Sequence, residues 1–288
     1  MAGSACSYSQ AVVDAGGADA VVTAMTSHTA NVELQGWGCV ALRNMAGGQN
    51  MAGGSNVCIQ AVVDAGALGA ALAAMGGHAA DAEVQRVGCG TLQNIADSGA
   101  CNEQAVVDAG GAAAVVAAMG RHIVDVELQG WGCGALQDMA AVSDTYTQEA
   151  CKQAVVNAGG AAAVVAAMGD HVADVELQRL GCGALANMAA GDDDACKQAV
   201  VNARGAEAVV AAMDGPVADD VELQRLGCGA LVNMAAGDDP CPQAVVGAGG
   251  AEAVVMAMAS HTADVELQRL CCGALRNMAG GDDTYTQE

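Results

Sequence analysis

Phenylalanine is absent from the 288 residues, and the only aromatic residues are two Trp and three Tyr. Hydrophobic residues nevertheless make up 53% of the chain, so they are mostly Ala, Val, Leu, Met and Cys. Such small side chains do not fill a wide, irregular core, but they let helices approach one another closely. The composition therefore favours thin layers of stacked helices.

Basic residues are also scarce. Ten Lys and Arg stand against 33 Asp and Glu, which gives a formal net charge of −23. A surface this acidic repels phosphate backbones, so we expect no nucleic-acid partner. It favours solubility and attracts basic partners, although it identifies none.

Long apolar runs are missing too. The longest, around residues 112–119, falls far short of the roughly 20 residues that cross a bilayer. The N-terminal sequence MAGSACSYSQ has neither the basic nor the apolar region of a signal peptide. We therefore expect no membrane insertion. The thirteen cysteines are then expected to be reduced, in the cytoplasm or another reducing intracellular compartment.

An internal repeat organises what is present. QAVVDAGG or a related segment starts at Gln10, Gln60, Gln104, Gln153, Gln198 and Gln243. VELQ or AEVQ ends at Gln35, Gln85, Gln129, Gln178, Gln224 and Gln268. AL-x-N-M-A or a variant then carries the anchor residue, which is Asn44, Asn94, Asp138, Asn187, Asn233 or Asn277. The spacing within each unit is nearly constant, and only the joints vary.

Each unit is predicted to contain three helices. A short first helix ends at a glycine or glycine pair, because Gly accepts the backbone angles that end a helix. The second helix is almost wholly apolar, as expected of a buried helix. A loop with His and then Asp or Asn follows, and the Asp or Asn suits the N-cap of the third helix. The third helix runs from VELQ through the anchor residue.

These motifs resemble armadillo repeats over residues 6–281. The resemblance implies an all-α, right-handed superhelical solenoid of about six three-helix repeats, with third helices lining a concave groove. Residues 1–288 are predicted to form one array, with units at about 6–47, 55–97, 98–141, 148–190, 193–236 and 239–281. The string DTYTQE occupies residues 144–149, just before Cys151 and the fourth unit, and again residues 283–288, so residues 282–288 predict the start of a further unit. Neither end has a convincing cap, so we expect the ends to continue or to meet partners in a larger complex.

No constellation of residues predicts catalysis. One His per unit (His28, His78, His122, His171 and His261) lies at a helix C-terminus, and adjacent units are too far apart to share a zinc ion. Cys39 and its five equivalents lie near Leu42 on the predicted buried face. A second set, which begins with Cys6, lies at the start of the first helices, and neither set has CxxC spacing. We predict no enzyme, no metal and no cofactor.

The predicted binding surface is the third-helix groove. On a helical wheel the anchor Asn points away from Leu42, and in nuclear-import adaptors of the armadillo family such Asn residues bind extended peptides. Those adaptors place Trp four residues before the Asn, where this chain has Val40 or Gly. The alternative is a structural role for these Asn residues, in helix capping or in hydrogen bonds between units. Glycines inside the helix indicate either close approach of a partner or inheritance by duplication. Trp37 and Trp131 either anchor a partner or pack between units.

The sequence thus predicts a non-catalytic protein–protein interaction scaffold or assembly subunit that binds a peptide or helix, favoured to be basic. The alternatives are an importin-alpha-like cargo adaptor and a regulatory repeat domain of a larger enzyme such as a kinase. The predicted partner-binding residues are Trp37, Asn44, Gly90, Asn94, Trp131, Asp138, Gly183, Asn187, Gly229, Asn233, Gly273 and Asn277. Arg86, Arg179, Arg225 and Arg269 are placed beside this groove, facing either a partner or the adjacent units.

Overall fold

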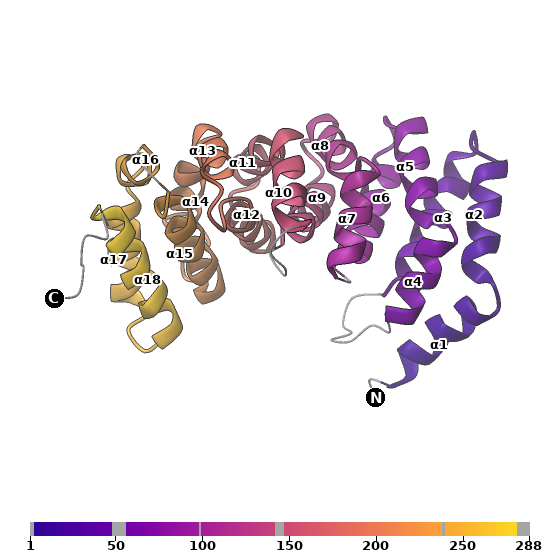
Figure 1. Cartoon of the computed structure of the whole chain (residues 1–288), viewed down its shortest axis with the longest axis horizontal. Coiled ribbons are helices and arrows are strands. Elements are labelled where there is room, and N and C mark those ends of the chain that lie inside the picture. The colour runs from indigo at the N-terminus through magenta and orange to yellow at the C-terminus, as the bar shows by residue number, and fades with distance from the viewer. Residues whose placement is uncertain (1–2, 48–55, 98, 142–146, 238–239, 281–288) are drawn as a thin grey trace. The chain divides into compact units, whose positions relative to one another are not determined.

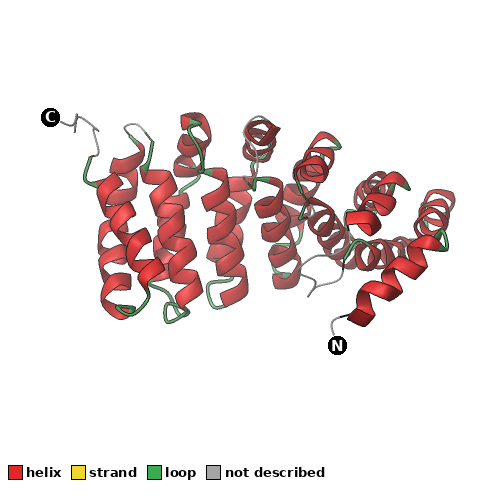
Figure 2. Cartoon of the chain, turned by 60° about the horizontal axis from the view of Figure 1, so that its bottom comes forward, coloured by secondary structure: helices red, strands yellow, loops and turns green. Residues whose placement is uncertain are grey.

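Helices alternate with short turns throughout the computed structural model, which describes residues 3–47, 56–97, 99–141, 147–237 and 240–280. These residues contain eighteen helices and no strand (Figures 1 and 2). The prediction of an all-α repeat fold is confirmed. The predicted further unit at 282–288 lies outside the described residues.

The chain divides into two compact units, Met1–Gly160 and Ala161–Glu288. The first contains α1 (Gly3–Asp14), α2 (Gly17–Ser27), α3 (Val32–Met45), α4 (Asn56–Asp64), α5 (Ala67–Gly77), α6 (Ala82–Ala96), α7 (Ala100–Asp108), α8 (Gly111–Arg121), α9 (Val126–Met139) and α10 (Thr147–Asn157). The second contains α11 (Gly160–Asp170), α12 (Val175–Met188), α13 (Asp194–Asn202), α14 (Gly205–Met213), α15 (Val221–Ala235), α16 (Cys241–Gly247), α17 (Gly250–Ser260) and α18 (Val265–Met278). Each repeat contributes one first, one second and one third helix, in that order.

The glycine pairs turn the chain between the first and second helices. Gly16 has φ 79°, in the left-handed region that favours glycine. The second glycine is needed for space, because a Cβ at Gly17 would lie 2.6 Å from Cγ1 of Val12. In the fifth repeat Arg204 takes the first position with φ 67°, and it is the one described non-glycine residue with positive φ.

Acidic or amide side chains cap the third helices as predicted. Oδ1 of Asp220, for example, accepts a hydrogen bond from the backbone N–H of Leu223 at 2.8 Å. This contact satisfies one of the N–H groups that have no partner inside the helix. The six N-cap residues are Asn31, Asp81, Asp125, Asp174, Asp220 and Asp264.

The repeated glutamine ties each third helix to the end of the second. Nε2 of the buried Gln35 donates hydrogen bonds to the carbonyl oxygens of Met25 (2.9 Å) and His28 (3.1 Å). His28 itself ends α2, as predicted for the histidines. In the second repeat Nε2 of His78 also contacts the carbonyl oxygen of Thr29 at 2.8 Å, so this histidine joins neighbouring repeats. These contacts give the histidines a structural role.

The core of each unit lies between stacked third helices and the second helices beside them. In the first unit α3, α6 and α9 pack in succession, and in the second unit α12, α15 and α18 do the same. Each of the first five third helices has a glycine against a second-helix methionine. A Cβ at Gly38 would lie 2.5 Å from Sδ of Met25. Small residues therefore bring the helices close together, as the composition predicts.

The cysteine prediction needs two corrections. Cys39, Cys89, Cys133, Cys182 and Cys228 are buried, but their equivalent Cys272 is exposed. The thiol of Cys228, for example, lies 3.4 Å from Sγ of Cys271 in the next repeat, whereas α18 has no described helix after it. In the second set Cys101 is exposed as well, near the start of α7, and the side chain of Cys6 lies outside the described part.

Across the described ranges no single helix is long and apolar enough to cross a membrane. Three pairs of helices joined by a sharp bend meet the length and composition criteria only when taken together.

Candidate functional site

Arginines on three of the third helices bridge adjacent repeats. Arg179 of α12 donates to the carboxylate of Asp220 from Nε (2.9 Å) and Nη2 (2.5 Å), and Asp220 is the N-cap of α15. Its Nη1 also reaches Glu176, one turn earlier on α12, at 3.3 Å. The guanidinium thus lies between a carboxylate of its own helix and one of the next third helix.

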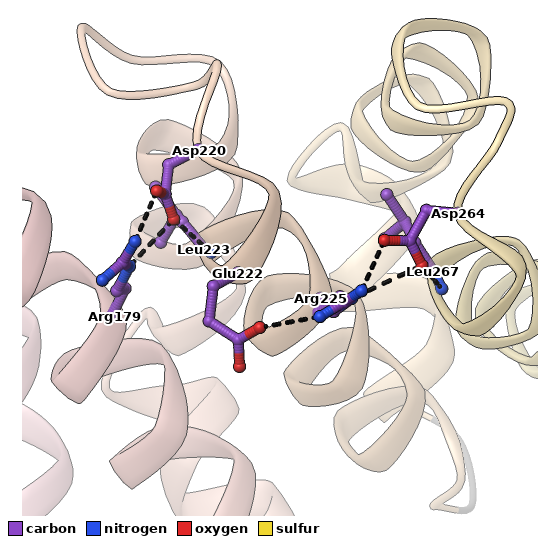
Figure 3. Close-up of polar contacts among 7 residues, drawn as sticks. All are labelled: Arg179, Asp220, Glu222, Leu223, Arg225, Asp264 and Leu267. Carbon is purple, nitrogen blue, oxygen red and sulfur yellow. Dashed lines mark hydrogen bonds and ion pairs between the residues drawn. The ribbon is translucent and has the colours of Figure 1, made fainter.

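The same arrangement recurs one repeat later (Figure 3). Arg225 of α15 donates from Nη2 to Asp264, the N-cap of α18, at 2.6 Å, and from Nη1 to Glu222 at 3.1 Å. The hydrogen bond from Arg179 is the main cause that lowers the pKa of Asp220. At Asp264 the backbone N–H of Leu267 lowers the pKa most, followed by Arg225. Both carboxylates are therefore held in the charged form that binds a guanidinium.

The other two arginines at this repeat position form different ion pairs. Arg86 of α6 pairs with Glu83 of its own helix and reaches Glu127 of α9 at 2.6 Å. Arg269 of α18 pairs with Glu266 of its own helix at 2.5 Å. The sequence left it open whether these arginines face a partner or adjacent repeats. The structure places Arg86, Arg179 and Arg225 on adjacent repeats.

In the first repeat Gly36 stands at the position of this arginine, and it lines a pocket. The pocket has a volume of about 330 Å³ and lies between α3 and α6. Trp37, the neighbour of Gly36, is 68% exposed, although large aromatic side chains are usually well buried. The residues that line this Trp37 pocket are Val32, Glu33, Gly36, Trp37, Val40, Asp81, Glu83 and Val84. An apolar surface thus stands beside three carboxylates.

Trp131 has a different environment. The guanidinium carbon of Arg43 lies 5.3 Å from the centre of its ring, within the range of a cation–π contact. A Cβ at Gly90 would lie 3.3 Å from the Trp131 ring and 3.1 Å from Cδ of Arg43. Gly90 therefore makes room for side chains of the neighbouring repeats. Trp131 packs between repeats, whereas Trp37 is largely exposed.

Several anchor asparagines join neighbouring repeats. Nδ2 of Asn94 donates to the carbonyl oxygens of Arg43 (3.1 Å) and Gly47 (2.7 Å), at the end of the preceding third helix. Asn233 and Asn277 donate in the same way to Ala186 (2.9 Å) and Val232 (3.0 Å). Asn187 is half-buried, and Asn44 is exposed on α3. Inter-repeat hydrogen bonding, one of the two roles proposed for these residues, thus accounts for three of them.

Asp138 is the one acidic residue among the anchors. Burial first, together with the negative charges of Asp97 and Glu103, raises its pKa to about 7, although a hydrogen bond with Gln93 acts in the lowering direction. The amide of Gln93 also fills the space beside Gly134, where a Cβ would lie 2.5 Å from Nε2. A half-buried carboxyl group that is desolvated in this way favours its neutral form below about pH 7.

The predicted groove glycines fall into different environments. Gly90 makes room for neighbouring side chains, as does Gly134 at the same repeat position, and Gly183 is buried. A Cβ at Gly229 would meet no atom within 4 Å, and one at Gly273 would lie 3.6 Å from Cγ2 of Val232. In the part of the chain that the structure describes, no group of three or more His, Cys, Asp or Glu side chains is arranged to hold a metal ion.

Solved structures with a similar fold show which kind of repeat this is. An engineered protein of the Northeast Structural Genomics Consortium is 30% identical over 91% of this chain and 96% of its own, with a TM-score of 0.75. A second engineered protein of that consortium is 33% identical, with a TM-score of 0.80, and covers 96% of this chain and 62% of its own. A designed armadillo repeat protein in complex with the peptide (KR)4 is 22% identical over 90% of this chain and 98% of its own, with a TM-score of 0.73. The chain has the armadillo-repeat fold. No protein-family model and no curated protein sequence matches it.

One functional signal in these armadillo repeats was readable in the sequence but was missed. The two tryptophans each follow a glycine, in Gly36-Trp37 and Gly130-Trp131, whereas the other four repeats have Arg followed by Val or Leu. Loss of the arginine and gain of the tryptophan therefore go together. Only the structure shows why this matters, because the bridge that the arginine makes extends to a residue 41 positions later.

Proposed function

We propose that this armadillo-repeat chain is a non-catalytic scaffold that binds a basic segment of a partner protein, with the Trp37 pocket as its main contact. The observation that carries the proposal is an exposed tryptophan beside the carboxylates of Glu33, Asp81 and Glu83. Tryptophan is enriched among the residues that contribute most to protein–protein binding. The net charge of −23 attracts a basic partner from a distance.

The designed armadillo repeat protein bound to (KR)4 supports a peptide as the form of the partner. Another similar fold belongs to armadillo proteins designed for modular peptide recognition. An extended basic peptide would place its charges beside the carboxylates while its aliphatic stems contact Trp37, Val32 and Val40.

The proposal is tested by calorimetric titration at low salt with three octapeptides, (KR)4, (GS)4 and (DE)4. We expect (KR)4 to bind and the neutral and acidic peptides to bind at least tenfold more weakly. Trp37→Ala should weaken the binding of (KR)4 by about 2 kcal/mol, the usual size for such a residue. Its unfolding should be nearly unchanged, because the side chain is 68% exposed.

Val124→Ala is the matched control, since Val124 is an 87% exposed apolar residue of the same unit that does not line the pocket. It should leave affinity unchanged. Equal binding of (KR)4 and (GS)4 would overturn the proposal of a basic partner. Equal affinity of Trp37→Ala and the unaltered chain would remove Trp37 from the binding surface.

A further inference from the structure

The second unit shows how this chain binds a guanidinium group. Each site uses a glutamate in the first turn of one third helix and the aspartate that caps the next. Glu176 and Asp220 hold Arg179, and Glu222 and Asp264 hold Arg225. A planar guanidinium matches this arrangement because its N–H donors point in two directions at once.

The first repeat keeps both carboxylates without the arginine. Glu33 occupies the repeat position of Glu176, and Asp81 that of Asp220, whereas Gly36 stands where Arg179 would be. A Cβ at Gly36 would meet no atom within 4 Å, so the space is open. Among the described residues, no Lys or Arg forms an ion pair with Glu33 or Asp81, and Arg86 pairs with Glu83 and Glu127 instead.

The site in the first repeat also has a tryptophan, Trp37, which the two sites in the second unit lack. The corresponding neighbours of Arg179 and Arg225 are Leu180 and Leu226. An indole ring beside the carboxylates offers a flat face on which a guanidinium stacks, in addition to its hydrogen bonds. Because Trp37 is 68% exposed, a side chain that enters from outside reaches that face.

We propose that the Trp37 pocket is a specific receptor for an arginine side chain of the partner. The incoming guanidinium takes the place that Arg179 and Arg225 fill in their own repeats, between Glu33 and Asp81, with Trp37 along one face. This inference rests on the proposed function, since it names the residue of the basic segment that the pocket selects. A lysine ammonium is a point charge and lacks the planar two-sided donor set, so it fits less well.

The experiment compares (KR)4 with octalysine, which has the same length and charge. We expect the unaltered chain to bind (KR)4 about tenfold more tightly, because bidentate arginine–carboxylate pairs are stronger than single ammonium contacts. The deciding variant is Gly36→Arg, which supplies the pocket with an arginine of its own. Gly36→Arg should bind the two peptides equally.

Two control variants are matched to Gly36→Arg. Gly69→Arg makes the same change of charge on α5, at a glycine outside the pocket where an added Cβ would likewise meet no atom within 4 Å, and Gly36→Ala makes the same loss of glycine without a guanidinium. Both should keep the tenfold preference for (KR)4. Circular dichroism confirms that each variant is folded, and replacing a helical glycine should stabilise α3 and α5.

The outcomes separate the two proposals. If octalysine binds as tightly as (KR)4 to the unaltered chain, the arginine receptor is wrong while the basic-segment scaffold stands. The same conclusion follows if Gly36→Arg keeps the preference for (KR)4. If neither basic peptide binds better than (GS)4, the proposed function itself is wrong.

Discussion

Asp138 stands at a position where the other five repeats have asparagine. Three of those asparagines donate to carbonyl oxygens of the preceding repeat, which an ionised carboxylate does not do. Burial raises the pKa of Asp138 to about 7 instead. In the third repeat the amide donor of asparagine is thus replaced by a carboxyl group that favours its protonated form.

Asp138→Asn is therefore expected to stabilise the protein above neutral pH. The folded chain holds a proton on Asp138 up to about pH 7, whereas the unfolded chain releases it near the ordinary value of 3.8. The contribution of Asp138 to stability is thus fully present below that value and is lost as pH rises to about 7. We expect the free energy of unfolding of Asp138→Asn, relative to the unaltered chain, to rise by about 2 kcal/mol or more between pH 5 and pH 8. Urea unfolding at the two pH values measures this. A constant difference between the proteins would show that Asp138 is ionised in the fold at both.

Helix α15 carries two glycines two residues apart, and they have opposite environments. A Cβ at Gly227 would lie 2.7 Å from Cγ of Met213 on the adjacent α14, in the core. A Cβ at Gly229 would meet no atom within 4 Å. The first glycine sets the approach of two helices, and the second leaves the helix surface open.

Alanine at these two positions should change stability in opposite directions. Gly229→Ala should raise the free energy of unfolding by about 0.5–1 kcal/mol, because alanine favours helix and nothing obstructs its methyl group. Gly227→Ala should lower it by about 1–3 kcal/mol, because the methyl group forces Met213 to move within a packed core. Denaturant titrations followed at 222 nm compare the two variants directly, and a shift of the same sign in both would contradict the packing described for α15.

The net negative charge of the whole molecule destabilises the folded state, whereas its local ion pairs stabilise it. The 33 acidic residues repel one another, whereas pairs such as Arg179–Asp220 and Arg225–Asp264 are few and partly exposed. Repulsion over the surface is screened by salt within roughly 10 Å at 0.1 M. Exposed ion pairs contribute little to stability, about 0–1 kcal/mol each.

We therefore expect the melting temperature to rise when NaCl is increased from about 0.02 to about 0.5 M, a range over which charge screening becomes short-ranged. Thermal unfolding followed by circular dichroism tests this. The binding of (KR)4 should weaken over the same range, because attraction between opposite charges is screened too. A falling melting temperature would mean that the arginine bridges outweigh the general repulsion.

Much of the fold was predictable from short stretches of sequence within each repeat. The spacing from Asp or Asn to Gln to the anchor residue predicted the third helices and their caps, because capping involves residues only a few positions apart. The glycine pairs predicted the turns for the same reason. The core positions of Leu42 and Cys39 followed from helical periodicity alone.

Tertiary structure decided what depends on contacts between repeats. Trp37 and Trp131 have equivalent places in the sequence, yet one is exposed beside an open pocket and the other packs against Arg43. Cys272 shares its motif with five buried cysteines but is exposed, because no described helix follows α18. The partners of Arg179 and Asn94 lie about one repeat away, at a distance along the chain that helical periodicity does not address. Each guanidinium site is formed by residues of two neighbouring repeats. Only the stacked structure therefore distinguishes a filled guanidinium site from an open one.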